Sequence, residues 1–486
     1  MLDAREWRGV WWDPQKPDEQ IAGVLSFSQA DAELELIGLL PDPRRDEAPQ
    51  SGSIELLFGL VDRPRIHGLT VDGKAITLDR CIPRSRTIGS GVPVERHHPG
   101  IIIVGHHFDG EIEFDAIEVR FTHLDEWAGL SGFSESLDWT DERKVEAIKV
   151  EFRPPEDITA TLADGTSLEI GFAWSWSGTA VVTTRAEIEQ RAGVVARFPA
   201  PRAFDEALKL VGRVRNFLNL GIGHPVHPRE VVGVLESQEP DVDEADHLAS
   251  SRTRVEVLYA LSDQPDPSDM RERALLPHEM RFTLRDIHDS LDRRLQAWLD
   301  RYDILRPALD LYFGVAYGAV RYLEPRFLSL MQALETYHRR SSSTTVLPEE
   351  EHAEWVESVL GAIRDEASRE RLARLVEHAN EPPLRARLKE VLASCPDVAP
   401  KIVGKTRAFL QAAVTGRNYL THYDPDLEAQ APKGIELLPL AAQVGALLEM
   451  CFLREIGFTC EEIDAIFTRV RRYEEIEHLG RIAVGE

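Results

Sequence analysis

Two residues in the last fifth of the chain, Arg417 and His422, have side chains that suit chemistry on a phosphate group. The guanidinium of arginine is permanently charged, and its planar fork matches phosphate oxygens. Histidine titrates near neutral pH, so it can accept and return a proton. This pair supplies what metal-free RNA cleavage needs. One group moves the proton of an attacking 2′-hydroxyl, and a cation stabilises the charged transition state.

The residues from Lys401 to Tyr423 carry apolar positions at helical spacing and predict a helix. Asp424 precedes Pro425, which disfavours the α conformation, so the helix should end near His422. The negative end of the helix dipole favours a protonated imidazole at that position. The helix has no acidic residue and four basic ones, Lys401, Lys405, Arg407 and Arg417. These cations are expected to contact RNA, together with Tyr423.

The spacing of Arg417 and His422 leaves open how both side chains reach one phosphate and whether the pair is catalytic at all. Residues five apart on an ideal helix point about 140° away from each other, so one straight helix does not aim both at one phosphate. Either the helix unwinds at His422, or two copies of the chain build the site, which predicts a homodimer. A surface cation and a helix cap are the plainer interpretation of the same residues. Similar spacings recur at Arg273–His278, Arg281–His288, Arg371–His378 and Arg471–His478.

Length and residue pattern predict two kinds of domain around this helix. The chain has 486 residues, and single cores stop growing at roughly 250–300 residues. Short apolar or alternating runs separated by Gly, Pro and Asp fill the first 190 residues or so. Helical spacing dominates from Phe282 onward. We therefore expect an α+β multidomain protein, with a β-rich, sandwich- or barrel-like domain at residues 1–280 and an all-α bundle at residues 281–486.

Individual segments refine this expectation. The β runs are Ile54–Leu60, Leu69–Leu78, Ile101–Val104, Ile112–Phe121 and Leu168–Trp176, with a helix at Phe204–Leu220 and acidic linkers at 236–252 and 262–273. The helices are Asp286–Tyr302, Leu323–Arg340, Pro348–Glu366, Leu384–Leu392, Pro400–Tyr423, Ile435–Ile456 and Cys460–His478. Trp174 and Trp176 share one face of a strand, where core packing is expected and an exposed ligand-binding pair is the alternative.

The remaining bulk properties restrict the chemistry. A formal net charge of −27 repels nucleic acid at long range, so RNA binding would depend on a local basic patch. Four scattered cysteines without a CxxC pair predict reduced, buried thiols. We expect no metal and no cofactor. The first twelve residues lack a signal-peptide core, and no apolar run approaches a membrane span, so a cytoplasmic protein without membrane contact is expected.

The sequence Arg417-Asn418-Tyr419-Leu420-Thr421-His422 resembles the RNxxTH signature of HEPN domains, in particular the ApeA-like HEPN family of bacterial anti-phage defence. The run from Phe327 to Arg339 is similar to the first HEPN helix of that family, with its Gln-Ala-Leu-Glu-x-Tyr-His pattern. The front of the chain resembles the ApeA N-terminal domain at Gly9–Trp12, Ile21–Gly38, His67-Gly68, Thr77-Leu78 and Leu124–Trp127. The resemblance covers most of the chain.

The resemblance implies a four-helix HEPN bundle at about residues 320–480 that works as a dimeric, metal-independent endoribonuclease in abortive infection. It makes Arg417 and His422 catalytic, places Asn418 beside the arginine, and offers Glu335 as a residue that orients one of them. A plain helix-surface carboxylate is the alternative for Glu335. The front domain would sense a phage-derived trigger and restrain the nuclease, and tRNA is the expected target. The competing function is a non-catalytic HEPN scaffold that binds RNA or dimerises.

Overall fold

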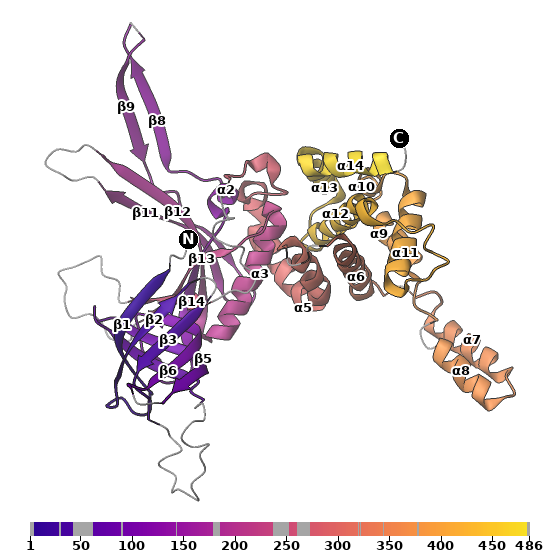
Figure 1. Cartoon of the computed structure of the whole chain (residues 1–486). Coiled ribbons are helices and arrows are strands. Elements are labelled where there is room, and N and C mark those ends of the chain that lie inside the picture. The colour runs from indigo at the N-terminus through magenta and orange to yellow at the C-terminus, as the bar shows by residue number, and fades with distance from the viewer. Residues whose placement is uncertain are drawn as a thin grey trace, which may run out of the picture. The chain divides into compact units, whose positions relative to one another are not determined.

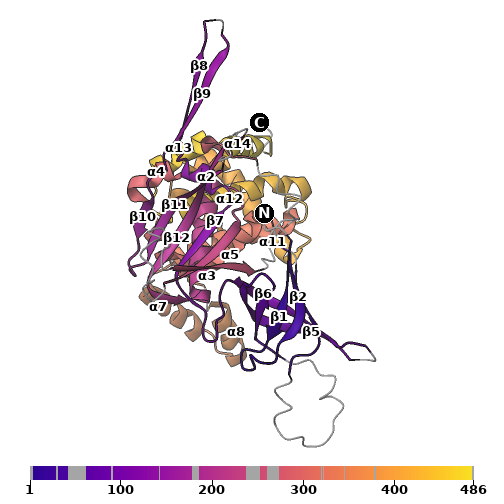
Figure 2. The same ribbon diagram turned by 90° about the vertical axis from the view of Figure 1, so that its left-hand side faces the viewer.

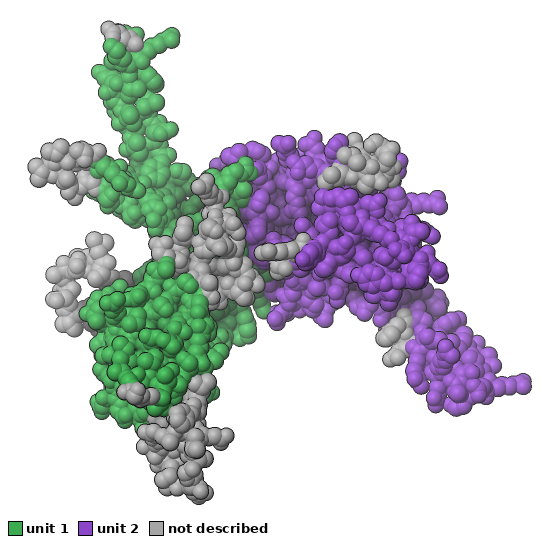
Figure 3. All heavy atoms as spheres, in the orientation of Figure 1, with its two compact units in different colours: residues 1–218, 226–275 green, residues 219–225, 276–486 purple. Residues whose placement is uncertain are grey.

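The computed structural model divides the chain into two compact units. Unit 1 comprises residues 1–218 and 226–275, and unit 2 comprises residues 219–225 and 276–486 (Figure 3). The sequence-based boundary between residues 280 and 281 differs from this division by five residues and by the short segment 219–225. The structure describes residues 4–483 except 29–30, 42–61, 89–90, 142, 178–184, 237–251, 260–272, 319, 321, 344 and 377–378.

The first half of unit 1 is a closed barrel of six antiparallel strands (Figure 1). Strand β6 pairs with both β3 and β5, which closes the ring β6-β3-β2-β1-β4-β5. Its strands are β1 (Arg5–Trp12), β2 (Ile21–Phe27), β3 (Ala32–Ile37), β4 (Arg65–Thr70), β5 (Ala75–Thr87) and β6 (Val94–Val104). Trp11 fills the interior and is fully buried. Gly68 makes room for it, because a Cβ there would lie 2.2 Å from the indole ring.

The second half of unit 1 continues the same sheet beyond the barrel. In the order β10-β11-β12-β7-β13-β14, the strand β14 joins the barrel through β6. The strands are β7 (Glu113–Phe121), β10 (Ile158–Thr161), β11 (Ser167–Ser177), β12 (Glu187–Ala203), β13 (Pro228–Glu236) and β14 (Arg252–Tyr259). The helices are α2 (Leu124–Ala128) and α3 (Phe204–Ile222), and the division between the units falls inside α3. The β structure therefore extends well past residue 190.

A two-stranded hairpin, β8 (Phe133–Trp139) with β9 (Val145–Phe152), forms a separate sheet that projects from unit 1 (Figures 1 and 2). The expectation that Trp174 and Trp176 pack in a core is wrong, because they are 55% and 60% exposed. The alternating burial of β11 stops at Phe172, and the strand runs on beyond the core. The predicted strand Ile54–Leu60 and most of both acidic linkers lie outside the described residues.

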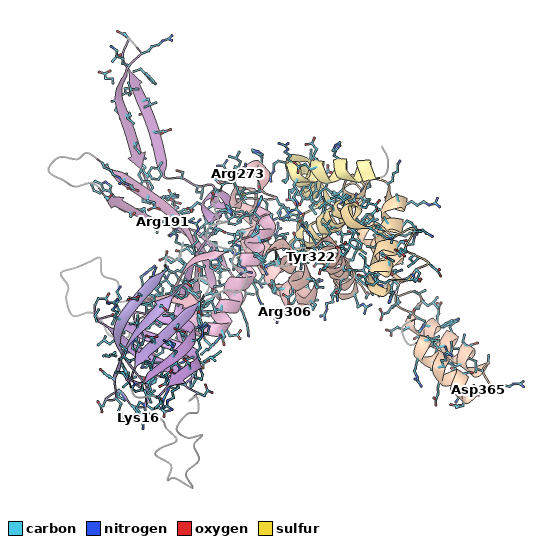
Figure 4. The ribbon with its side chains drawn as sticks, viewed as in Figure 1. Lys16, Arg191, Arg273, Arg306, Tyr322 and Asp365 are labelled. Carbon is cyan, nitrogen blue, oxygen red and sulfur yellow. A yellow bond between two sulfur atoms is a disulfide. The ribbon has the colours of Figure 1, made fainter. Side chains whose placement is uncertain are left out.

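Unit 2 is helical, as the sequence predicts. Its α-helices are α4 (Leu284–Ile287), α5 (Leu291–Ala316), α6 (Leu323–Ser341), α7 (Glu349–Gly361), α8 (Glu366–Val376), α9 (Leu384–Ala393), α10 (Ala399–Val403), α11 (Thr406–His422), α12 (Leu437–Glu455), α13 (Cys460–Arg469) and α14 (Arg471–Ala483). Single 3-10 turns are η2 (Pro277–Glu279), η3 (His288–Ser290) and η4 (Gly434–Glu436). Helix α6 packs against α5, α11 and α12, whereas α7 and α8 pair as a helical hairpin whose connection contains Asp365 (Figure 4). The α+β expectation is confirmed.

Three predicted helices are each divided in the structure. The segment Pro400–Tyr423 breaks at Gly404, whose φ of +63° is left-handed, so α10 and α11 are separate. The segment Cys460–His478 breaks at Val470, and Pro348–Glu366 breaks after Gly361. Conversely, α5 continues past Tyr302 to Ala316 even though Pro307 lies inside it. Periodicity located these helices but did not fix their ends.

Helix α12 is the core of unit 2. The expectation that no apolar run approaches a membrane span is wrong, because the segment Gly434–Glu455 is long and apolar enough to cross a membrane by length and composition. In the structure 78% of its most apolar window is buried, as expected for the central helix of a bundle. Phe452 and Leu448 on this helix are fully buried.

The expectation of four reduced cysteines is wrong for one pair. Cys395, just after α9, and Cys460, the first residue of α13, form a disulfide with their Cα atoms 5.6 Å apart. They lie 65 residues apart in sequence, so only the packing of the bundle brings them together. Cys81 and Cys451 are free and buried, as expected.

Candidate active site on helix α11

Helix α11 presents Arg417 from a tightly packed position. Phe409, Leu410 and Ala413 are buried along its inner face. At Gly416 the helix approaches its surroundings closely, since a Cβ there would lie 2.9 Å from the ring of Pro432 and 3.4 Å from the ring of Phe327. A side chain at this position would clash with the ring of Pro432, in the segment before η4. The glycine immediately before Arg417 therefore allows α11 to lie close to Pro432.

Arg417 is held by two oxygen acceptors. Its Nη2 donates to Oε2 of Glu335 at 3.1 Å, and its Nη1 donates to Oδ1 of Asn418 at 3.2 Å. The side chain of Arg417 is 31% exposed and that of Glu335 is 21% exposed. The guanidinium is thus oriented by its neighbours while part of it still faces solvent. The structure places Glu335 against Arg417, one of the two partners proposed for it from the sequence.

His422 is the last residue of α11 and is exposed. Among the described residues its imidazole makes no hydrogen bond and no ion pair. Tyr423 follows in the left-handed conformation, with φ at 51°, and its backbone N–H donates to the carbonyl of Tyr419 at 2.6 Å. The helix therefore ends where the Asp424-Pro425 sequence predicts. It stays helical through His422, so the alternative in which the helix unwinds to bring His422 toward Arg417 is not observed.

The residues predicted to bind RNA differ in their positions and in their contacts. Lys401 lies on α10 rather than on the motif helix, and its ammonium is paired with Asp464. Lys405 is the N-cap residue of α11, and Arg407 is exposed in its first turn. Tyr423, beside His422, is 66% exposed. The basic patch expected from the sequence is therefore divided between two helices, with the charge of Lys401 already partnered.

Sequence reasoning missed two neighbours of this helix end. Tyr419 lies inside the motif, and its ring packs edge-on against Tyr423 with centroids 5.6 Å apart. Lys433 places its Nζ 5.3 Å from the centroid of the Tyr419 ring. Tyr419 could have been found from its position between Asn418 and the histidine. Lys433 follows Pro432 in a segment without any motif, so nothing in the sequence pointed to it.

Glu335 also belongs to a larger network of charges. Its Oε1 lies 3.6 Å from Nη2 of Arg339, one turn further along α6. The same Arg339 nitrogen lies 2.9 Å from Oε2 of Glu381, which Arg387 also approaches at 2.9 Å. Arg387 in turn is 3.4 Å from Nδ1 of His338. Alternating charges from α6, α9 and the residues before α9 therefore support the carboxylate that holds Arg417.

Nothing in the described part of the chain groups three or more metal-ligating side chains in a way that would hold an ion. Histidines of the β-rich region, which are common metal ligands, make ring and carboxylate contacts in the structure. The ring of His107 stacks on that of His67 with centroids 4.8 Å apart, and His97 is fully buried beside Glu95. The groups gathered at Arg417 are cations, an amide and a carboxylate that is already engaged.

Comparisons with known families agree with this architecture. Residues 6–298, more than half of the chain, match the model of the ApeA N-terminal domain 1, and residues 328–462 match the model of the Apea-like HEPN domain. The second match includes Glu335, Arg417 and His422. Searches of curated proteins and of solved structures each returned no match. The chain therefore belongs to the ApeA family and has the architecture of a HEPN-type anti-phage defence protein.

Proposed function

We propose that the chain is a metal-independent endoribonuclease that cleaves RNA in abortive infection, with Arg417 and His422 as its catalytic residues. The observation that carries this proposal is the orientation of Arg417 and the exposure of both side chains. Arg417 is oriented by Glu335 yet remains 31% exposed, and His422 is exposed at the end of the same helix. A phosphate reaching this surface would meet a preorganised cation and an exposed imidazole that can accept a proton.

The reaction uses only side chains and the RNA itself. His422 takes the proton of a 2′-hydroxyl as that oxygen attacks the adjacent phosphorus, and Arg417 stabilises the extra negative charge. The new 2′-oxygen–phosphorus bond replaces the bond to the 5′-oxygen, which leaves with the proton returned by His422. The products carry a 2′,3′-cyclic phosphate and a 5′-hydroxyl. No water or metal takes part in this step.

A homodimer through unit 2 completes the site in this proposal. Because α11 is helical through His422, the two side chains of one chain point about 140° apart. Two copies related by a two-fold axis would bring Arg417 of one chain toward His422 of the other. Two such cationic surfaces repel each other until RNA phosphate lies between them. Binding of substrate would therefore favour the assembled site.

The target and the control of this activity are also proposals. Exposed Tyr423 and the cations Lys405 and Arg407 are the residues proposed to contact RNA, and tRNA is the proposed substrate. Unit 1 would respond to a phage-derived trigger and restrain unit 2 until then, in the cytoplasm. The presence of the ApeA N-terminal domain on the same chain supports this division of labour.

A non-catalytic scaffold is the second candidate. The ion pair between Arg417 and Glu335 favours it, because a structural arginine would make the same contact. RNA cleavage by purified protein separates the two functions. Wild-type protein is compared with Arg417→Ala, Arg417→Lys and His422→Ala. The matched controls are Arg273→Ala and His278→Ala, a pair with the same five-residue spacing and an exposed histidine.

The enzyme proposal expects all three motif variants to lose cleavage and both controls to keep it. Arg417→Lys should fail because a point ammonium does not reproduce the bidentate geometry of the guanidinium. Cleavage at the wild-type rate by the His422→Ala protein would leave the scaffold as the better description.

A further inference from the structure

Unit 2 contains a cavity of about 380 Å³ that the proposed RNA site does not use. Its walls come from α5, α6, α12, α14 and the segment 219–225. The volume falls within the range of roughly 300–1,000 Å³ typical of small-molecule sites. Apolar residues such as Val315, Leu330 and Ala441 line part of it, and charged side chains line the rest. A mixed lining of this kind is also typical of ligand pockets.

The cavity lies beside a buried carboxylate that is fully engaged. Glu449 of α12 is 0% exposed and accepts hydrogen bonds from the hydroxyls of Tyr312 and Tyr473, each at 2.7 Å. Arg281 and Arg472 lie 2.5 and 3.1 Å from its Oε1. Burial alone would raise the pKa of Glu449, but the charges of the two arginines hold it at about 2. Glu449 is therefore ionised at neutral pH and neutralises only one of the two guanidinium groups.

The balance of charge around the cavity is positive. Three arginines line it, Arg281, Arg326 and Arg472, against two glutamates, Glu449 and Glu475. With three positive and two negative charges the lining carries a net charge of +1, whereas the whole chain carries −27. A cationic cavity in so acidic a protein selects for an anion.

Three side chains at the cavity offer hydrogen-bond donors to a ligand. Asn219 is 2% exposed, and its Nδ2 has no hydrogen-bond partner among the described residues. Buried amide groups are nearly always paired, so an unpaired one calls for an explanation. The guanidinium of Arg326 is exposed and makes no ion pair with any described side chain. Arg472, with 43% of its side chain exposed, keeps donors free beyond its contact with Glu449.

We propose that this cavity binds a small phosphomonoester of nucleotide size. Its phosphate would lie between Arg326 and Arg472, since three terminal oxygens and a double negative charge suit two guanidinium forks. An acceptor on the ligand would satisfy Nδ2 of Asn219, and an apolar or aromatic body would pack on Leu330 and Ala441. Leu330 lies on α6 five residues before Glu335, or about 7.5 Å along the helix axis. Glu335, Arg417 and His422 do not line the cavity, so it is distinct from the RNA site although both use helix α6.

Isothermal titration calorimetry on the full-length protein tests this site, with adenosine monophosphate, inorganic phosphate and adenosine as probes. We expect adenosine monophosphate to bind, phosphate to bind more weakly, and adenosine to bind at least tenfold more weakly than its monophosphate. Arg326→Gln removes a charged donor from an exposed position and should weaken the binding of adenosine monophosphate about tenfold. Arg306→Gln, an exposed arginine of α5 that does not line the cavity, should leave the affinity unchanged.

Repeating the titration with Arg417→Ala protein distinguishes binding in this cavity from binding at the RNA site, the other place where a nucleotide would meet an arginine. Retained affinity in Arg417→Ala, together with the loss in Arg326→Gln, supports the proposal. It is overturned if neither anion binds, if Arg326→Gln binds as tightly as wild type, or if Arg417→Ala abolishes binding.

Discussion

The contact between Glu335 and Arg417 makes a quantitative prediction for the variant Glu335→Gln. The substitution keeps the shape of the side chain and removes its charge. Oε2 of Glu335 now accepts a charge-assisted hydrogen bond from Nη2 of Arg417 at 3.1 Å. In the variant the amide oxygen can offer only a neutral hydrogen bond from α6, so the guanidinium is held less firmly beside Oδ1 of its neighbour Asn418. The variant should therefore bind RNA but stabilise the transition state less well.

The size of the effect follows from burial. Hydrogen bonds to charged groups contribute about 1.5–3 kcal/mol when buried, and exposed ion pairs contribute about 0.2–1 kcal/mol. The two side chains are 31% and 21% exposed, so the contact lies between these limits and solvent screens part of it. A loss of about 1 kcal/mol corresponds to a decrease of about fivefold in kcat. KM should stay the same or fall, because a negative charge beside the RNA site has been removed.

Steady-state cleavage of a labelled RNA measures both constants, and thermal unfolding checks that the variant is folded. Glu381→Gln is the matched control, because Glu381 is in the same network and contacts Arg339 and Arg387. It should leave kcat within about twofold. An unchanged kcat in Glu335→Gln, or an equal loss in Glu381→Gln, would refute the positioning role of Glu335.

Three further predictions concern the metal, the buried carboxylate and the dimer. Cleavage should be indifferent to EDTA and give 2′,3′-cyclic phosphate ends; magnesium-dependent recovery after chelation would contradict this. The pKa of Glu449 lies at about 2 instead of 4.5, so its contribution of about 3 kcal/mol to unfolding free energy is present above pH 4.5 and lost toward pH 2. Unfolding by guanidinium chloride, measured between pH 2 and 7, should show that the Glu449→Gln protein lacks this part of the acid sensitivity. The same pH dependence in wild type and variant would be inconsistent with the prediction. Finally, inactive Arg417→Ala and His422→Ala proteins should regain partial cleavage when mixed under subunit exchange, whereas no recovery despite exchange would mean that each chain builds its own site.

The sequence predicted the class of the fold because burial leaves a periodic signature. Alternation located several strands of unit 1, and helical spacing located most helices of unit 2. Closure of the barrel could not be predicted, because it depends on β6 pairing with β5 as well as β3. The disulfide was missed for a similar reason, since Cys395 and Cys460 meet only through the packing of α9 and α13. Contacts between distant segments leave no local pattern in one sequence.

The candidate site was predictable where a motif or a helix end defines it. Arg417, Asn418 and the end of α11 at His422 follow from a few adjacent residues and from Pro425. The break at Gly404, which separates Lys401 from the motif helix, was not predicted because glycine is tolerated inside helices as well as at their ends. Glu381 and Lys433 were also missed, because they come from segments without a motif.

The most direct test of Arg417 and His422 as catalytic residues is RNA cleavage by purified His422→Ala protein. The imidazole is exposed and has no described partner, so its removal should leave the fold and the melting temperature unchanged. Cleavage should fall to background in this variant, while His278→Ala, with the same spacing from Arg273, keeps wild-type activity. A His422→Ala protein that cuts RNA at the wild-type rate would contradict the assignment of the active site.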